Sequence, residues 1–147
     1  MIGPPGSGKS TFCHGLQTIL GQLEKSAVFV NLDAANDDVP FECDVDVCDF
    51  LDIGKVQDEE KIGPNGAFIR CVELLLSQID QLKSELNEFD EESIFIFDCP
   101  GQVELVTQHD ALKKVLEELD FRFVVANLID SQYCQEPGKF MSCVLLT

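Results

Sequence analysis

The stretch Gly3-Pro4-Pro5-Gly6-Ser7-Gly8-Lys9-Ser10-Thr11, near the start of the chain, satisfies the pattern G-x-x-x-x-G-K-[ST] in full. Its glycines let consecutive N–H groups turn toward one anion, and the helix expected from Ser10 to about Gln22 adds its positive N-terminus. In this pattern Lys9 contacts the β- and γ-phosphates, the Ser10 hydroxyl ligates Mg²⁺, and Thr11 is placed to donate to the α-phosphate. The stretch therefore predicts a site for nucleotide phosphates.

Outward from this loop, short apolar runs alternate with segments of helical periodicity. The runs predicted as strands are Ala27–Asn31, 93–97 and 121–129, and the predicted helices are 10–22, 66–89, 109–119 and a last one from 139 onward. Strands that alternate with helices indicate a parallel sheet covered on both faces. We therefore expect an α/β P-loop NTPase fold, a three-layer sandwich with a mainly parallel sheet, in one domain over residues 1–147.

The segment 66–89 is predicted as one long helix, about 30 Å in length. Its apolar residues recur at alternating spacings of four and three, and form a narrow seam. Two interpretations stand open, a helix laid on the sheet and a helix that also packs against another subunit. The seam consists of Phe68, Val72, Leu75, Ile79, Leu82, Leu86 and Phe89.

Acidic and amide residues follow two of the predicted strands. Asp98 stands at the carboxyl end of strand 93–97, where an aspartate holds Mg²⁺ directly or through water, and Gln102 and Glu104 follow at positions that could orient an attacking water. Asp33 follows strand Ala27–Asn31 and is expected at the same edge, because ligands of open parallel sheets lie at the carboxyl ends of the strands. The alternative for both aspartates is a role in turn formation.

Composition and net charge argue against several further classes of function. The chain has 147 residues and a net charge of −17, which argues against a nucleic-acid or anionic-membrane surface. Much of the acid lies in residues 37–60, which hold ten acidic residues and one basic residue. Seven cysteines without a CxxC pair favour reduced thiols and an intracellular protein. Only Met1 and Ile2 represent the strand expected to lead into the loop, so we expect that the domain lacks most of this N-terminal strand.

Four motifs in order add a family resemblance: NLDAAN at 31–36, Gly63-Pro64-Asn65 before the long helix, FDCPGQVEL at 97–105, and LIDSQYC at 128–134. With them the chain resembles the GPN-loop GTPases from end to end. The resemblance implies a GTPase that uses Mg²⁺ and GTP and whose active site is assembled by dimerisation. Asn65 would then act on the nucleotide of the partner subunit, alongside Asp33, Gln102 and Glu104 of the subunit that binds it.

The resemblance also implies partners and a location. It implies a homodimer, or a heterodimer with another GPN-loop GTPase, and a role in assembly and nuclear import of RNA polymerases through their subunits or assembly factors. A cytoplasmic protein that shuttles to the nucleus is expected. Two departures stand out: Ala34 replaces the proline usual in NLDPAN, and no [NT]-K-x-D segment for guanine recognition occurs in 1–147. We therefore expect the C-terminal base-binding part to be missing.

Two other readings remain open. The chain could be a truncated, non-catalytic fragment or isoform that only binds partners. It could also be a small-molecule kinase, although such enzymes clamp the migrating phosphoryl group with several arginines. This sequence has two, Arg70 and Arg122.

Overall fold

The computed structural model describes residues 1–36, 38–90, 92–102 and 109–145. Its sheet has three parallel strands in the order β2-β1-β3, formed by β1 (Ala27–Asn31), β2 (Val45–Asp46) and β3 (Ile94–Asp98). β1 confirms the predicted strand, and β3 lies one residue further along than predicted. The two-residue β2 lies within the acidic segment 37–60 and was not expected. The register pairs Asn31 with both Asp46 and Asp98, so the carboxyl ends of all three strands meet at one edge.

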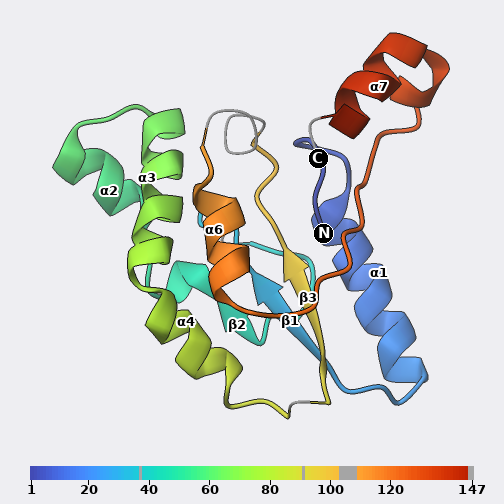
Figure 1. Cartoon of the computed structure of the whole chain (residues 1–147), viewed down its shortest axis with the longest axis horizontal. Helices are drawn as coiled ribbons and strands as arrows, with labels where there is room; N and C mark the ends of the chain where they lie inside the picture. Colours follow the sequence, from blue (N-terminus) through green and yellow to red (C-terminus); the bar gives the residue numbers. More distant parts are fainter. Residues whose placement is uncertain (37, 91, 103–108, 146–147) are drawn as a thin grey trace.

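Helices cover both faces of this sheet, which confirms the three-layer α/β architecture (Figure 1). α1 (Lys9–Gln22) covers one face, where Cys13 packs with Phe29 and Phe41. The opposite face carries α3 (Pro64–Ser77), α4 (Ile79–Leu86) and α6 (Ala111–Glu118). The remaining elements are η1 (Val47–Asp49), α2 (Ile53–Glu60), η2 (Tyr133–Gln135) and α7 (Pro137–Leu145).

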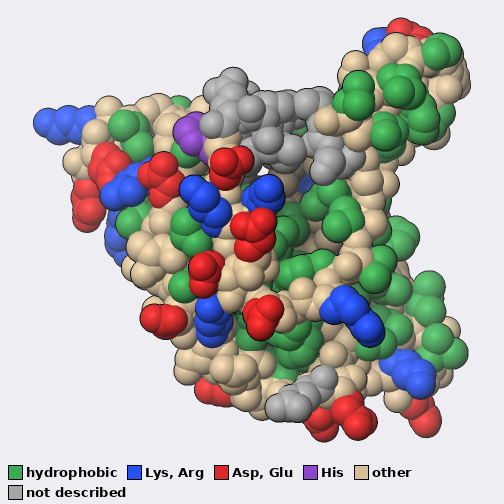
Figure 2. Space-filling view, viewed as in Figure 1, with side chains coloured by type: hydrophobic (Ala, Val, Ile, Leu, Met, Phe, Trp, Pro, Cys, Tyr) green, Lys and Arg blue, Asp and Glu red, His purple; other side chains and the backbone are tan. Residues whose placement is uncertain are grey.

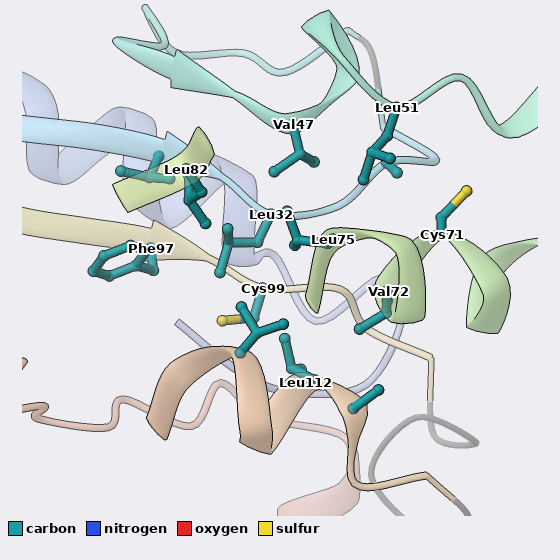
Figure 3. Close-up of a cluster of buried hydrophobic side chains, with 14 of the residues drawn as sticks. Leu32, Val47, Leu51, Cys71, Val72, Leu75, Leu82, Phe97, Cys99 and Leu112 are labelled. Carbon is teal, nitrogen blue, oxygen red and sulfur yellow. The ribbon is translucent and has the colours of Figure 1, made fainter. Parts of the chain in front are cut away.

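The larger core lies between the sheet and the helices α3, α4 and α6. Leu75 of α3, Leu82 of α4 and Leu32 after β1 are almost completely buried there, and Figure 3 shows them converging from separate elements. Burying a leucine side chain contributes about 1.5–3 kcal/mol relative to leaving it exposed. This core fixes the position of the strand ends at which the candidate site lies.

The prediction of one continuous helix over 66–89 was wrong, because the helix is broken into two. Gln78 has φ −109° and ψ 21° and separates α3 from α4. The Ser77 hydroxyl donates to the Leu74 carbonyl at 2.7 Å, and the N–H of Gln78 is shared between the Leu74 and Leu75 carbonyls. A carbonyl that accepts a side-chain hydroxyl in this way disturbs the regular backbone hydrogen bonds of the helix, and the helix ends at this point. The apolar seam still faces this chain's own core on both sides of the break.

The strand predicted over 121–129 was also wrong. Within it the structure has one isolated parallel bridge, between Ile2 and Asn127, and Val124 is 95% exposed. Met1 and Ile2 occupy the position between β3 and this segment: the N–H of Cys99 donates to Met1 and that of Ile2 donates to Ala126. Among the described residues no strand lies beside 121–125, so their β-rich composition alone does not make them a strand.

An apolar groove of about 1060 Å³ lies alongside, between β3, α6 and residues 121–126. Figure 2 shows hydrophobic side chains gathered in this hollow. The ring of Phe121 lies 4.9 Å from that of Phe95, measured between centroids, so aromatic contacts bind the segment to the sheet in place of a hydrogen-bonded ladder. No helix in the described part of the chain is long and apolar enough to cross a membrane.

Candidate functional site

The loop that precedes α1 adopts the backbone that its glycines permit. Gly6 and Gly8 have φ of +76° and +90°, in the region that residues with a side chain rarely adopt, and Gly8 is the N-cap of α1. Gly3 is required for another reason: a Cβ there would lie 2.3 Å from the carbonyl oxygen of Leu128. The loop is thus formed as the sequence predicts, with its N–H groups at the start of a 14-residue helix.

A cavity of about 360 Å³, which we call the loop cavity, opens at the carboxyl ends of β1 and β3. It brings together nine of the residues predicted for the site from three separate parts of the sequence. These are Pro5, Gly6, Gly8, Lys9, Ser10, Thr11, Asp33, Asp98 and Gln102, and they are joined in the wall by Asn36, Cys99 and Gly101. Gly3, Pro4 and Ser7 belong to the loop but do not line the cavity, and Glu104 lies outside the described residues.

Two polar contacts organise the floor of this cavity. The Ser10 hydroxyl donates to Asp98 Oδ2 at 2.6 Å, and the buried Lys9 ammonium donates to the carbonyls of Gly3 and Pro4 at 3.1 and 3.2 Å. Asp98 is 1% exposed, and its Oδ1 has no hydrogen-bond partner among the described residues. Such an orphaned acceptor is costly in a folded protein and points to a missing donor or cation.

Burial of the carboxylates at the site disfavours their charged form. Burial raises the pKa of Asp98, although the Ser10 hydrogen bond and the charge of Lys9 oppose the shift. Burial also raises the pKa of Asp33; the N–H of Ala35 opposes this shift, while the charge of Asp98 adds to it. Both carboxylates would be relieved by a nearby positive charge.

The donor set fits Mg²⁺. This ion prefers hard oxygen ligands, usually one or two from the protein with the remainder from phosphates and water. The Ser10 hydroxyl and the Asp98 carboxylate, with its orphaned Oδ1, provide such oxygens, and both residues line the cavity. Among the residues that the structure describes, no cluster of three His, Cys, Asp or Glu side chains could hold a metal by itself. A ligand with its own oxygens is therefore needed to complete a coordination shell here.

Gly101 lets the segment after Asp98 approach the loop. A Cβ at this position would lie 2.5 Å from Lys9 Nζ and 3.1 Å from the backbone nitrogen of Pro5. Only a glycine leaves Lys9 in its place against this segment. The adjacent Gln102 lines the cavity and is half-buried.

The structure does not bring Gly63-Pro64-Asn65 to the loop cavity. Gly63 is the N-cap of α3 and Pro64 its first residue, a position that suits proline because its missing N–H would have no partner there. All three residues are exposed, and none lines the cavity of its own chain. Figure 1 shows the start of α3 and the phosphate loop at the same end of the sheet but apart from each other.

The arginines do not support a phosphoryl clamp. Arg70 forms ion pairs with Glu60 at 2.9 Å and Glu73 at 3.1 Å, on the surface between α2 and α3. Arg122 lines the apolar groove. Neither arginine reaches the loop cavity, so the feature expected of a small-molecule kinase does not occur there.

Sequence reasoning missed two amides, Asn31 and Asn36. Asn31 is completely buried at the end of β1, and Asn36 lines the cavity with its Nδ2 at 3.4 Å from Ser10 Oγ. The available signal in the sequence was a polar residue at the end of an otherwise apolar strand, because a buried polar group needs hydrogen-bond partners in the fold.

Comparison with known proteins agrees with this geometry. A family model described as "conserved hypothetical ATP binding protein" matches residues 1–147. The chain is 43% identical over 145 residues to GPN-loop GTPase 2 of Danio rerio, covering 97% of this chain and 46% of that protein. It is 44% identical over 154 residues to GPN-loop GTPase 2 of Saccharomyces cerevisiae, covering 99% of this chain and 44% of that protein. The chain thus spans about half the length of these curated relatives.

Among solved structures, the chain resembles an apo-form GTPase from Pyrococcus abyssi with a TM-score of 0.79. The two chains are 24% identical, and the match covers 99% of this chain and 61% of the other. This likeness establishes the fold.

Proposed function

The chain belongs to the GPN-loop GTPase family, and on that premise we propose that it is part of a GTP-binding and GTP-hydrolysing molecular switch. The observation that carries the proposal is the loop cavity, in which Lys9, Ser10 and Asp98 meet below a helix N-terminus. The names of the relatives support GTP as the nucleotide. The sequence itself contains no [NT]-K-x-D segment to select guanine.

In this mechanism the chain's residues bind the phosphates and position a water. The N–H groups of the loop and α1 donate hydrogen bonds to the phosphate oxygens, and Lys9 exchanges its two carbonyl contacts for the β- and γ-phosphates. Ser10 and Asp98 are the residues that would hold Mg²⁺, which neutralises charge that develops on the phosphates.

Hydrolysis also needs a water in line with the γ-phosphate. We assign its positioning to Asp33 and Gln102, which line the cavity with Asp98, together with Glu104. Asp33 suits the role of base, because burial raises its pKa above the ordinary value for aspartate and so makes it a better proton acceptor. Gly101 keeps this wall close to Lys9.

We propose further that Asn65 acts in trans, in a homodimer or a heterodimer with another GPN-loop GTPase. The support is its exposure at the start of α3, outside its own chain's cavity, where it is free to reach a second subunit. Asn65→Ala should then lower turnover more than nucleotide affinity.

A mixing experiment tests the trans role. Lys9→Ala removes phosphate binding and Asn65→Ala removes the donated residue, so each variant alone should be inactive. In a mixture, half of the dimers carry one intact site, and about one quarter of the wild-type turnover should return. Mixtures that stay as inactive as their components, while dimerisation is intact, would exclude action in trans.

The resemblance also supports a cellular role, which we propose as assembly and nuclear import of RNA polymerases through their subunits or assembly factors. The −17 net charge suits basic partners and disfavours direct contact with nucleic acid. A cytoplasmic protein that shuttles to the nucleus fits this role.

The test of the enzymatic proposal is release of inorganic phosphate from Mg·GTP. Wild-type chain should release it, and Lys9→Ala should abolish release because the phosphate-binding charge is gone. Lys25→Ala is the matched control, since Lys25 is an exposed lysine away from the loop cavity. Equal rates in the Lys9 and Lys25 variants would exclude the loop cavity as the site. A folded wild-type chain that binds partners but neither binds nor hydrolyses GTP would favour a non-catalytic role.

A further inference from the structure

The amide of Asn31 is the most completely satisfied polar group in the interior beside the site. The residue is 0% exposed. Its Nδ2 lies 2.9 Å from the carbonyl oxygen of Asn36, 3.0 Å from Asp46 Oδ1 and 3.5 Å from the carbonyl oxygen of Asp33. Its Oδ1 accepts the N–H of Asp33 at 3.0 Å. Three oxygen acceptors and the Cys48 sulfur, at 3.8 Å, surround the nitrogen and a donor faces the oxygen, so the orientation of the amide is determined by its partners.

Asp46 ties this amide to the neighbouring strand. Asn31 and Asp46 stand opposite each other in the parallel register of β1 and β2. The same Asp46 Oδ1 also accepts the N–H of Cys48 at 2.9 Å, where it caps the short helix η1. One carboxylate oxygen therefore joins the end of β1 to the turn that follows β2.

The segment held by this amide is a wall of the loop cavity. Residues 33–36 form a tight turn in which the N–H of Asn36 donates to the Asp33 carbonyl at 3.0 Å and the N–H of Ala35 donates to Asp33 Oδ1 at 3.1 Å. Both Asp33 and Asn36 line the cavity, and Asn36 reaches Ser10 Oγ. Among the described residues, the Asn31 amide joins this turn to the end of β1, and the Cys48 thiol also donates to the carbonyls of Asp33 and Asn36 at 3.7 and 4.0 Å.

We propose that Asn31 is a positioning residue for GTP hydrolysis: held by Asp46, it fixes the turn 33–36 so that Asp33 and Asn36 stand at the phosphate side of the loop cavity. This inference rests on the proposed function. It assigns to β2, a strand of two residues, the task of anchoring this wall. Displacing a catalytic group by about 1 Å can cost on the order of 100-fold in rate, so small movements of this turn matter.

Asn31→Asp is the sharpest perturbation. It preserves the shape and the acceptor for the Asp33 N–H but places a carboxylate oxygen against three acceptors. We expect turnover of Mg·GTP to fall at least about tenfold while affinity for Mg·GDP stays within about twofold, because GDP lacks the phosphate that this wall faces. The matched control is Asn87→Asp, the same chemical change at an exposed residue after α4.

A second pair of variants keeps the test informative if Asn31→Asp does not fold. Asp46→Asn retains an oxygen for Asn31 and Cys48 and should behave as wild type. Asp46→Leu removes the oxygen and should reproduce the loss of turnover. Equal turnover in these two variants, or equal losses of turnover and of Mg·GDP affinity, would overturn the positioning role.

Amide hydrogen exchange separates this inference from the proposed function, because it needs no activity. In Asn31→Asp the N–H groups of Ala35 and Asn36 should lose protection while those of Val28 and Val30 in β1 retain theirs. Uniform loss over β1 and the turn, or no loss in the turn, would refute the positioning role. Absence of GTP hydrolysis in the wild-type chain would instead refute the proposed function and leave the exchange result to decide the role of Asn31.

Discussion

Replacing Ser10 by alanine tests the contact on which the site depends. The Ser10 hydroxyl donates to Asp98 Oδ2 at 2.6 Å, and Oδ1 of the same buried carboxylate has no partner among the described residues. A hydrogen bond to a charged group contributes about 1.5–3 kcal/mol. Alanine returns about 0.5 kcal/mol through its higher helix propensity, since Ser10 lies in α1. The free energy of unfolding should therefore fall by about 1 to 2.5 kcal/mol.

The assay is urea and thermal unfolding of the metal-free, nucleotide-free chain at neutral pH. For a chain of this length the expected loss corresponds to a decrease in Tm of roughly 2 to 10 °C. Ser84→Ala, at an exposed serine of α4, measures the propensity gain alone and should be neutral or slightly stabilising. Adding Asp98→Asn completes a double-mutant cycle, whose coupling energy should be about 0.5–3 kcal/mol.

Two results would refute this reasoning. The first is a Ser10→Ala variant as stable as Ser84→Ala, which would mean that the hydrogen bond contributes nothing to the folded state. Alternatively, Ser10→Ala and Asp98→Asn could be strictly additive, which would mean that the two side chains do not interact in solution. Either outcome removes the basis for a preformed Ser10–Asp98 metal site.

Three further predictions concern the same cavity. Gly101→Ala should lower stability by about 1–3 kcal/mol and weaken Mg·GTP binding, because the new methyl group meets Lys9 Nζ at 2.5 Å; calorimetry and denaturation measure both, and unchanged binding would show that Lys9 is held elsewhere. Burial raises the pKa of Asp33 and Asp98, so above a pH of about 4 the folded chain binds more protons than the unfolded chain. These two groups should therefore make the free energy of unfolding of the metal-free chain fall as pH rises through their raised pKa values. Asp98→Asn should make this fall with pH less steep, and an unchanged pH dependence in the variant would contradict the raised pKa of Asp98. Asn65→Ala should keep its affinity for Mg·GTP in titration and lose turnover in phosphate release, and a parallel fall in both would assign Asn65 to binding.

Local pattern was enough to predict the centre of this site. The loop, α1, β1 and β3 each follow from residues adjacent in sequence, and the rule that ligands lie at the carboxyl ends of parallel strands was enough to bring Asp33 and Asp98 together. The motif places glycines where the loop must turn its N–H groups toward an anion, and Gly6 and Gly8 have positive φ there.

Two of the errors in prediction depend on contacts between distant segments, and one depends on a local contact of a side chain with the backbone. Residues 121–129 have the composition of a strand, but a strand requires a hydrogen-bonding neighbour, and in the part of the chain that the structure describes only Ile2 forms a bridge with them. The break at Gln78 depends on a hydroxyl-to-carbonyl bond that periodicity does not reveal. Asn31 closes an apolar run, and its importance appears only when Asp46 and the turn 33–36 surround it.

The central claim is that the loop cavity binds the phosphates of Mg·GTP through Lys9 and the Ser10–Asp98 pair. Isothermal titration of the chain with GTP, in the presence of Mg²⁺ and then of EDTA, tests this claim most directly. The account predicts saturable binding that requires Mg²⁺ and is lost in Lys9→Ala but kept in Lys25→Ala. Binding of equal strength in EDTA, or in the Lys9 variant, would contradict it.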